Sequence, residues 1–380
     1  SPTQPPPFTC LYESVHTAFL DARGYRCAGW FGYDCYSDPY YAAVELQEVR
    51  ENCPVCCDRY PPLLPPELPL PLPPGPPPQQ PPPPQPPPLP LLPPVKLILD
   101  TDMGAGACRD VDDVVALCIS HALMDNGEAE LLAVLQDTAP PKCSGVISVL
   151  NHWYGRDDIP IGAYKGLGLS LAGNPPLTYV ESLVRNFPSP IKNSSQVPSS
   201  TDVYRRVLAS QADHSVAIAS IGLMTNLRAL LQSKADSHSP LDGRALFARK
   251  VKLLAVMGGV YPKGGYECNM MGGGGQDRRT GAQAAEYVFE NMPASVRVIL
   301  SGFLVGIRVN TGGKLSSCAP ASNPCRQAYI DYCTDSPGLC TKGSERAHSS
   351  FDPITTLVAV RGAAAASCDL SPPGINQVNG

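Results

Sequence analysis

From residue 95 onward, short apolar runs alternate with longer stretches of helical character. The apolar runs have the length of buried strands: VKLIL (95–99), LLAVL (131–135), SVAIAS (215–220), VKLLAVMG (251–258) and VRVILS (296–301). Helical stretches lie between them, over residues 114–124, 225–233 and 281–292. Strands that alternate with helices predict an α/β domain with a mostly parallel sheet flanked by helices. In such sheets, ligands bind at the carboxyl ends of the strands.

Proline divides the chain into three parts. Residues 61–94 hold 21 of the 44 prolines. Because proline lacks an N–H and has a fixed φ, this run can form neither a helix nor a sheet ladder, and it predicts a polyproline II rod. We therefore expect a Cys-rich module over residues 1–60, the rod over residues 61–94 and the α/β domain over residues 95–380.

The Cys-rich module is too short to depend on an apolar core alone. Three disulfides are therefore expected among its six cysteines, which are Cys10, Cys27, Cys35, Cys53, Cys56 and Cys57. Zinc is the alternative ligand of the CxxCC cluster at residues 53–57, although no second CxxC pair accompanies it. The cysteine spacing over residues 21–57 resembles the small ShK-toxin-like modules of secreted proteins, which implies a role in binding or assembly.

Composition narrows the classes of function. Fifteen cysteines suit an oxidising compartment, and the odd count leaves one thiol free or paired with another chain. The net charge of -5 argues against nucleic acid as a partner, and no run of about 18 apolar residues predicts a membrane span. A chain that begins at Ser1 without Met predicts that an export signal has been removed. Together with a glycosylation sequon at Asn193, these features predict a secreted glycoprotein of the cell surface or wall.

The largest group of candidate metal-binding or catalytic side chains follows the first predicted strand, in the segment LDTDMGAGACRDVDDVVAL. Five aspartates fall within fourteen residues there: Asp100, Asp102, Asp110, Asp112 and Asp113. Crowded carboxylates repel one another, so we expect a hard divalent cation with oxygen ligands, with Ca²⁺ favoured over Mg²⁺. The alternative is that the last two acids simply cap the following helix, which does not account for a cluster that begins on the strand. A dinucleotide motif is excluded, because Arg109 occupies the third glycine position.

The segment LDTDMG…DVDDVVAL resembles the N-terminal motif of the inosine–uridine nucleoside hydrolase family, whose members bind Ca²⁺. Further segments are similar to the family in the same order along residues 95–365: AELLAV (129–134), SIGLMTNL (220–227), AVMGGVY (255–261), ECN (267–269) and FDP (351–353). The resemblance implies a nucleoside-hydrolase-like fold and a Ca²⁺-dependent hydrolysis of the N-glycosidic bond of ribonucleosides.

The same resemblance implies a role for each matching residue. Asp102 would contact the cation and act as the general base on a water molecule. The remaining protein ligands of the cation would be the carboxylates of Asp113 and Asp352 and the backbone carbonyl of Ile221. Contacts to the ribose of the substrate would come from Asp112, Glu267 and Asn269. Carboxylates suit this reaction, because positive charge builds on the sugar as the glycosidic bond breaks.

Two positions near the implied substrate depart from the family pattern. Pro140 stands where the family has an asparagine, and Gln136 or Asp137 is the expected replacement for its ribose contact. Phe351 stands where the family has a histidine that assists the departing base. His348, three residues earlier, is either a replacement for that histidine or an ordinary surface side chain.

The cysteines of the α/β domain suggest a second set of covalent links. The loop before the paired aspartates carries an insertion, AGACRDV, and we expect a disulfide between Cys108 and Cys143 to clamp it. Cys118 lies on the apolar face of a predicted helix, which favours a buried thiol. Local disulfides are expected in a Pro/Ser/Gly-rich segment that holds Cys318, Cys325, Cys333 and Cys340.

The sequence therefore supports two hypotheses of different classes. The first is a secreted, Ca²⁺-dependent N-ribohydrolase that carries a disulfide-rich adaptor on a stiff stalk. The second is a structural subunit of an extracellular glycoprotein fibre, wall or surface coat. In that case the prolines of the rod would be hydroxylated and carry glycans, and the rod would mediate self-association into a filament or layer.

Overall fold

The structure is a computed structural model and describes residues 93–104, 110–166, 169, 177–262, 264–272, 275–341, 345–374, 376 and 378. The predicted Cys-rich module, with its disulfides and its zinc alternative, lies outside these residues, and so does the proline-rich rod up to residue 92. The predictions of self-association through the rod and of glycans on it therefore stay predictions.

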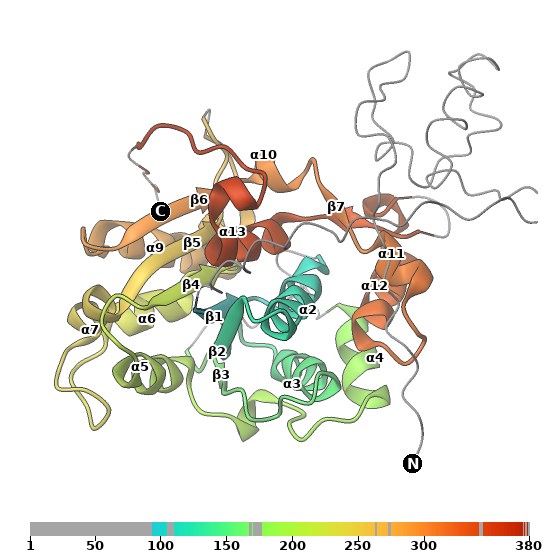
Figure 1. The fold of residues 1–380 in the computed structure, drawn as a ribbon, viewed down its shortest axis with the longest axis horizontal. Coiled ribbons are helices and arrows are strands. Elements are labelled where there is room, and N and C mark those ends of the chain that lie inside the picture. The colour runs from blue at the N-terminus through green and yellow to red at the C-terminus, as the bar shows by residue number, and fades with distance from the viewer. Residues whose placement is uncertain are drawn as a thin grey trace, which may run out of the picture. The chain divides into compact units, whose positions relative to one another are not determined.

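A six-stranded parallel sheet forms the centre of the described domain (Figure 1). Its strands are β1 (Val95–Thr101), β2 (Ala129–Gln136), β3 (Ile161–Ala163), β4 (Val216–Ser220), β5 (Val251–Met257) and β6 (Arg297–Ser301). They lie side by side in the order β3-β2-β1-β4-β5-β6, and every neighbouring pair is parallel. The predicted mostly parallel α/β sheet is confirmed, and each of the five predicted apolar runs contributes a strand.

Helices cover both faces of this sheet because its strands are apolar on both sides. Leu97 and Leu99 of β1 belong to one core, whereas Ile98 between them belongs to the other. The first core is shared with α2 (Asp112–Asp125), α3 (Cys143–Trp153), α4 (Thr178–Asn186), α12 (Pro324–Asp335) and α13 (Phe351–Ala365). The second is shared with α5 (Ser200–Ser210), α6 (Thr225–Gln232), α7 (Gly243–Lys250) and α9 (Gly275–Asn291). Such two-sided burial accounts for strands that read as continuous apolar runs.

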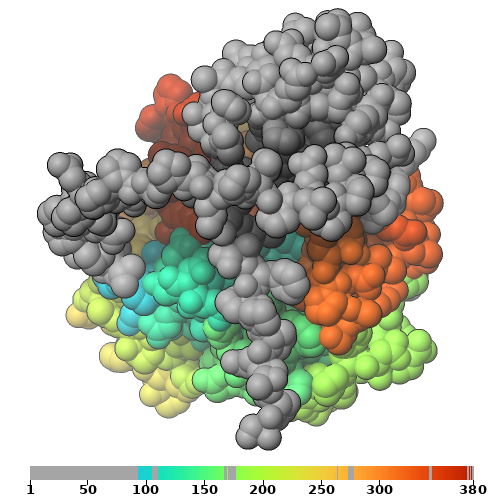
Figure 2. Space-filling model, turned by 45° about the vertical axis from the view of Figure 1, so that its right-hand side comes forward, coloured from blue at the N-terminus to red at the C-terminus, as the bar shows by residue number. Residues whose placement is uncertain are grey.

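Shorter elements complete the domain around the C-terminal half. They are the helical turns η2 (Ser194–Gln196), α8 (Cys268–Met271), α10 (Phe303–Gly306), α11 (Gly313–Cys318) and η3 (Pro337–Leu339), with the antiparallel strands β7 (Asn310–Thr311) and β8 (His348–Ser349). The orange helix α12 lies beside α4, as Figures 1 and 2 both show. None of the described helices is both long and apolar enough to cross a lipid bilayer.

Two disulfides link one described cysteine to another, and they correct several sequence-based predictions. Cys118 is not a thiol but is bonded to Cys325, which ties α2 to α12 across 207 residues of sequence. Cys143 is a free, buried thiol, so the predicted Cys108–Cys143 clamp is wrong. Helix α3 places Cys143 in the core behind the sheet end. The expected local disulfide is confirmed only for Cys333–Cys340, because Cys318 is free.

The order of the strands positions the candidate site. The chain first adds β2 and β3 on one side of β1, and then adds β4, β5 and β6 on its other side. The direction in which strands are added therefore reverses between β1 and β4. A crevice forms at such a switch point, outside the carboxyl ends of the two strands. Asp102 directly follows β1, and Ile221 directly follows β4. The N-termini of α2 and α13 converge on the same place.

Candidate active site

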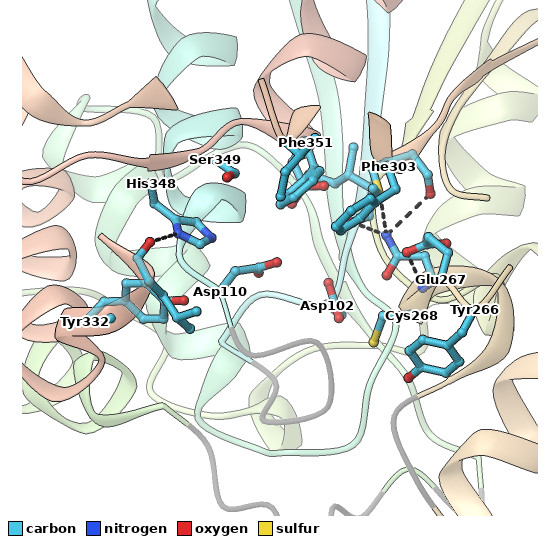
Figure 3. Close-up of a pocket in the computed structure, with 17 residues that line it drawn as sticks. Asp102, Asp110, Tyr266, Glu267, Cys268, Phe303, Tyr332, His348, Ser349 and Phe351 are labelled. Carbon is cyan, nitrogen blue, oxygen red and sulfur yellow. Dashed lines mark hydrogen bonds between the residues drawn. The ribbon is translucent and has the colours of Figure 1, made fainter. Parts of the chain in front are cut away.

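A cavity of about 480 Å³ opens at the carboxyl ends of β1, β4 and β5. Asp102, Ile221, Glu267 and Asn269 line it, together with Asp352 from the start of α13. Figure 3 shows Asp102 and Asp110 in the middle of the cavity, with His348 on one side and Glu267 on the other. The structure therefore brings the sequence-predicted residues to one cavity wall or directly behind it.

Four carboxylates approach one another closely enough to hold one metal ion. They belong to Asp110, Asp112, Asp113 and Asp352, and each offers an oxygen within 4.8 Å of the others. The segment before α2 supplies the first, the first turn of α2 the next two, and the first turn of α13 the last. Asp113 is fixed further by a hydrogen bond that Thr101 donates from the end of β1. Asp110, for which the family resemblance implies no role, is therefore a full member of the cluster.

Asp112 joins the two helix N-termini at this cluster. Its Oδ2 accepts hydrogen bonds from the backbone N–H groups of Phe351, at 2.8 Å, and Asp352, at 3.0 Å. Its Oδ1 is buried and has no partner among the described residues. Helix α2 itself has Val111 as its N-cap and no side-chain cap. The alternative that Asp112 and Asp113 simply cap their own helix is therefore wrong, because Asp112 satisfies the first N–H groups of a different helix.

Asp102 and Ile221 lie at the switch point itself. Asp102 is 3% exposed, and its Oδ2 has no hydrogen-bond partner among the described residues. The carbonyl oxygen of Ile221 accepts a hydrogen bond from Nδ2 of Asn269 at 3.2 Å. Asp102 lines the cavity that the four-carboxylate cluster borders, but it is not part of the closely spaced group itself.

Glu267 and Asn269 form a rigid corner of the cavity. Oε1 of Glu267 accepts from the backbone N–H of Asn269 at 2.9 Å, and Oε2 accepts from those of Gly259, at 3.0 Å, and Met270, at 3.1 Å. A side chain held by three backbone donors is pre-organised, because its rotamer is fixed before any ligand arrives. Burial raises the pKa of Glu267, although these hydrogen bonds act in the opposite direction.

Burial and repulsion from neighbouring carboxylates raise the pKa of both Asp102 and Asp352. Removal from water raises the pKa of Asp102 most, and the charges of Asp113 and Asp112 add to the effect. The pKa of Asp352 is raised in the same way, first by desolvation and then by its acidic neighbours. None of the ion pairs among the described residues reaches this cluster.

The residues present fit a divalent cation. Oxygen-only ligands in this number suit Ca²⁺, and the unpartnered oxygens of Asp102 and Asp112 are the kind of buried acceptors that a cation satisfies. A cation would also reverse the rise in pKa, since it favours the charged form of each carboxyl group.

An aromatic wall faces the acidic half of the cavity. The rings of Phe303 and Phe351 stack with their centroids 5.2 Å apart, and Tyr332 packs edge-on against His348 at 5.2 Å (Figure 3). His348 is only 7% exposed and lines the cavity, so it is not an ordinary surface histidine. Phe351, at the position where the family has a histidine, presents an apolar ring to the same space.

The expected replacements for the family asparagine do not line this cavity. The side-chain amide of Gln136 donates to the carbonyls of Thr138 and Pro140, both at 2.7 Å, so it is used inside the loop after β2. Asp137 is fully buried, and both its carboxylate oxygens lack partners among the described residues. Burial raises the pKa of Asp137, and the charges of Asp100 and Asp102 add to the rise. Asp137 therefore lies outside the residues that line the cavity, in surroundings that favour its neutral form.

The predicted glycosylation site lies apart from the cavity. Asn193 precedes η2 and is partly exposed, and its side-chain oxygen accepts hydrogen bonds from the N–H and hydroxyl groups of Ser195. The position is consistent with an exposed loop, and modification of the amide stays a prediction.

Comparisons with known proteins identify the fold. The chain is similar to the type III effector protein XopQ, solved as a complex with adenosine diphosphate ribose, with a TM-score of 0.52 and 15% identity over 71% of this chain and 82% of that one. It is similar to the effector protein XOO4466, with a TM-score of 0.53, the same identity and the same coverage. A plant nucleoside hydrolase, PpNRh1, matches with a TM-score of 0.47 and 20% identity over 70% of this chain and 79% of that one.

No protein-family model and no curated protein sequence matches the chain. The solved structures nevertheless cover about the length of the predicted α/β domain. The predicted nucleoside-hydrolase-like α/β fold is confirmed, as a likeness of fold.

Proposed function

We propose that this chain is a divalent-cation-dependent hydrolase that cleaves the N-glycosidic bond of a ribosyl compound. The observation that carries the proposal is the single cavity in which Asp102, with a buried and unpartnered carboxylate oxygen, stands beside the cluster of Asp110, Asp112, Asp113 and Asp352. This cavity lies where α/β sheets of this topology bind ligands. The fold shared with XopQ supports a ribosyl ligand, because that protein was solved with adenosine diphosphate ribose.

Each side of the cavity suits one part of such a substrate. The acidic side stabilises positive charge on a ribosyl ring as its bond to the base breaks. Glu267 and Asn269 are held rigidly by backbone hydrogen bonds and would position sugar hydroxyls. The stacked rings of Phe303 and Phe351 offer a flat apolar surface to a base.

Asp102 is the group best placed to accept a proton from the attacking water. Its Oδ2 makes no hydrogen bond within the described residues, so it is available to substrate-side groups. Asp113 and Asp352 would hold a Ca²⁺ ion, with the carbonyl of Ile221 as a further ligand and Asp110 and Asp112 within reach of the same ion. A bound cation supplies positive charge that lowers the pKa of a coordinated water and keeps the carboxylates ionised.

The experiment is a turnover assay on the full chain with Ca²⁺ present. A panel of purine and pyrimidine ribonucleosides, with adenosine diphosphate ribose, is followed by release of the free nucleobase. We expect hydrolysis of at least one compound and its loss on chelation with EDTA. Asp102→Asn should lower kcat by roughly 10²–10⁴-fold, the usual size of a general-base contribution.

Asp157→Asn is the matched control, because Asp157 is an exposed carboxylate paired with His152 away from the cavity. It should leave the rate unchanged. Two results would contradict the proposal: no base released from any compound in the presence of Ca²⁺, or a rate for Asp102→Asn equal to that of the unsubstituted protein.

We further propose that the enzyme works in an oxidising compartment outside the cell. The Cys118–Cys325 link supports this, since it closes a very long loop and such bonds persist where thiols are not kept reduced. Protein exported from a cell culture should yield the linked peptides of Cys118 and Cys325 on digestion without reductant. Recovery of both cysteines only as free thiols would contradict the proposed compartment.

A further inference from the structure

We propose that the cavity holds a second divalent-cation site, formed by Asp110, Asp112 and His348, which takes ions that accept a nitrogen ligand, such as Mn²⁺ or Zn²⁺. The ligand atoms of these three residues lie within 4.8 Å of one another. This inference goes beyond the proposed hydrolase function, because it concerns an ion in addition to the one held by oxygen ligands alone.

His348 has the hydrogen bonding of a metal-ligating histidine. Its Nδ1 lies 2.8 Å from the carbonyl oxygen of Leu339, and a carbonyl can only accept, so Nδ1 carries the proton. In a neutral ring, this tautomer leaves the lone pair on Nε2. Metal-binding histidines commonly donate their other ring N–H to a backbone carbonyl in this way, which fixes both the tautomer and the ring orientation.

The free nitrogen of His348 is directed into the acidic cluster. Nε2 is buried and has no hydrogen-bond partner among the described residues. His348 as a whole is only 7% exposed. Figure 3 shows the ring facing Asp110 across the cavity. A histidine kept only for packing would pair both nitrogens or turn one to water, and His348 does neither.

Asp112 offers the complementary atom. Its Oδ2 is engaged by the N–H groups of Phe351 and Asp352, whereas its buried Oδ1 is unpartnered. Metal–nitrogen and metal–oxygen bonds of about 2.1 Å place ligand atoms about 4 Å apart or less. Separations within 4.8 Å therefore close onto an ion with a shift of less than about 1 Å in the side chains.

The charge of the cavity favours two ions over one. Five carboxylates belong to its cation-binding side, those of Asp102, Asp110, Asp112, Asp113 and Asp352, and no Lys or Arg is among the described residues that line it. A single divalent cation offsets two of these five formal charges. Asp110 and Asp112 are common to the oxygen-only group and to the group with His348, and shared carboxylates are the usual bridges between paired ions about 3.5–4 Å apart.

The experiment measures metal binding to the full chain without any substrate. Protein freed of metal and then saturated with Ca²⁺ is titrated with Mn²⁺ by calorimetry, and the bound Mn²⁺ is examined by pulsed electron paramagnetic resonance. We expect one further Mn²⁺ to bind beside Ca²⁺ and its spectrum to show ¹⁴N coupling from an imidazole. His348→Gln should remove the coupling and weaken Mn²⁺ binding by at least about tenfold.

His152→Gln is the matched control, since His152 is an exposed histidine on α3 that pairs with Asp157. It should keep the nitrogen coupling. Absence of ¹⁴N coupling in the unsubstituted protein would overturn the proposal, and this measurement does not depend on whether a variant folds. Unchanged coupling in His348→Gln would overturn it as well. Because no turnover is measured, an inactive protein that binds Mn²⁺ through His348 would contradict only the hydrolase proposal.

Discussion

Two regions of this domain bury charged or ionisable side chains, and they differ in whether those side chains have partners within the chain. On the α5 side of the sheet, Arg205 is 2% exposed and donates to Asp236 twice, at 2.5 and 2.9 Å, and also to Ser233, Ser239 and Leu241. At the carboxyl end of the sheet, the carboxylates of Asp102, Asp112 and Asp137 keep buried oxygens that no described residue satisfies.

The difference separates a structural charge from a functional one. A buried ion that is kept for stability needs its counter-charge and hydrogen bonds within the chain, because desolvation otherwise exceeds the gain. The Arg205 region meets that requirement, and the guanidinium holds the pKa of Asp236 below its usual range. The acidic cavity does not meet it, so its carboxylates need either a proton or an external cation. Unpaired buried charge therefore marks the site more sharply than a count of acidic residues does.

The largest effect should come from breaking the paired region. Arg205→Met would leave the carbonyls of Ser239 and Leu241 without their donor and Asp236 without its cation. We expect a loss of about 3 kcal/mol in the free energy of unfolding, measured by urea denaturation of the full chain. Arg206→Met is the matched control, because Arg206 is exposed on the same helix and its loss should change stability by less than about 0.5 kcal/mol. Equal losses of unfolding free energy in the two variants would show that the buried Arg205–Asp236 pair contributes no more to stability than an exposed arginine does.

The next effect should come from the acidic cavity and should depend on the cation. Ca²⁺ at 100 times its Kd should stabilise the unsubstituted protein by about 2.7 kcal/mol, measured by calorimetry. Asp113→Asn should lose most of this response, yet in EDTA it should be at least as stable as the unsubstituted protein, because one source of repulsion is gone. Asp157→Asn should keep the full response. A Ca²⁺ response that survives in Asp113→Asn would place the ion elsewhere.

The two regions should also differ in the sign of their pH dependence. Burial raises the pKa of Asp100, beside the cavity, from 3.8 to about 7, although Tyr204 and Asn226 donate hydrogen bonds to it. The folded form then keeps a proton that the unfolded chain loses, so in EDTA stability should fall as pH rises from about 4 to 7. Each unit of such a shift corresponds to about 1.4 kcal/mol. Urea unfolding between pH 4 and 8 measures this, and a flat profile would contradict it.

Asp236 should act in the opposite direction. Because its pKa in the folded state lies below the unfolded value, its contribution is present above about pH 4 and is lost as pH falls further. The loss below pH 4 should be weaker in Arg205→Met, which has no guanidinium beside the carboxylate. An acid-side profile that is the same in both proteins would assign the loss to other groups.

The smallest effect should come from an exposed pair. Arg361 on α13 donates to both carboxylate oxygens of Glu128, at 2.6 and 2.7 Å, but both side chains are about one-third exposed. Exposed pairs contribute little because water and salt screen them, so Arg361→Ala should cost about 0.5 kcal/mol or less in urea denaturation. A loss comparable to that of Arg205→Met would show that an ion pair contributes equally to stability whether it is buried or exposed.

Sequence reasoning reached the main parts of the site because they are close in sequence. Asp102, Asp112 and Asp113 follow one strand and begin one helix, and a run of acids at that place is visible without any structure. The FDP and ECN segments were assigned to the same cavity only through a family resemblance, and the structure brings Asp352 and Glu267 to it.

Other parts could not be found in this way. The sequence left His348 open between a replacement for the family histidine and a surface side chain, because nothing nearby in sequence shows that β8 lies beside the start of α2. The disulfide prediction failed for the same reason: Cys118 and Cys325 are 207 residues apart and meet only when α12 packs on the core.

By itself, the sequence determined the alternation of strands and helices, and with it the parallel sheet and the end of the sheet where acids gather. Those features follow from local hydrophobic periodicity and from the polarity of parallel strands. Only the tertiary structure decided which carboxylates share one centre, that Asp112 satisfies the N-terminus of α13 rather than its own helix, and that Nε2 of His348 is unpartnered. The physical reason is that hydrogen bonding and desolvation depend on which atoms surround a group, and chain packing sets those neighbours independently of sequence distance.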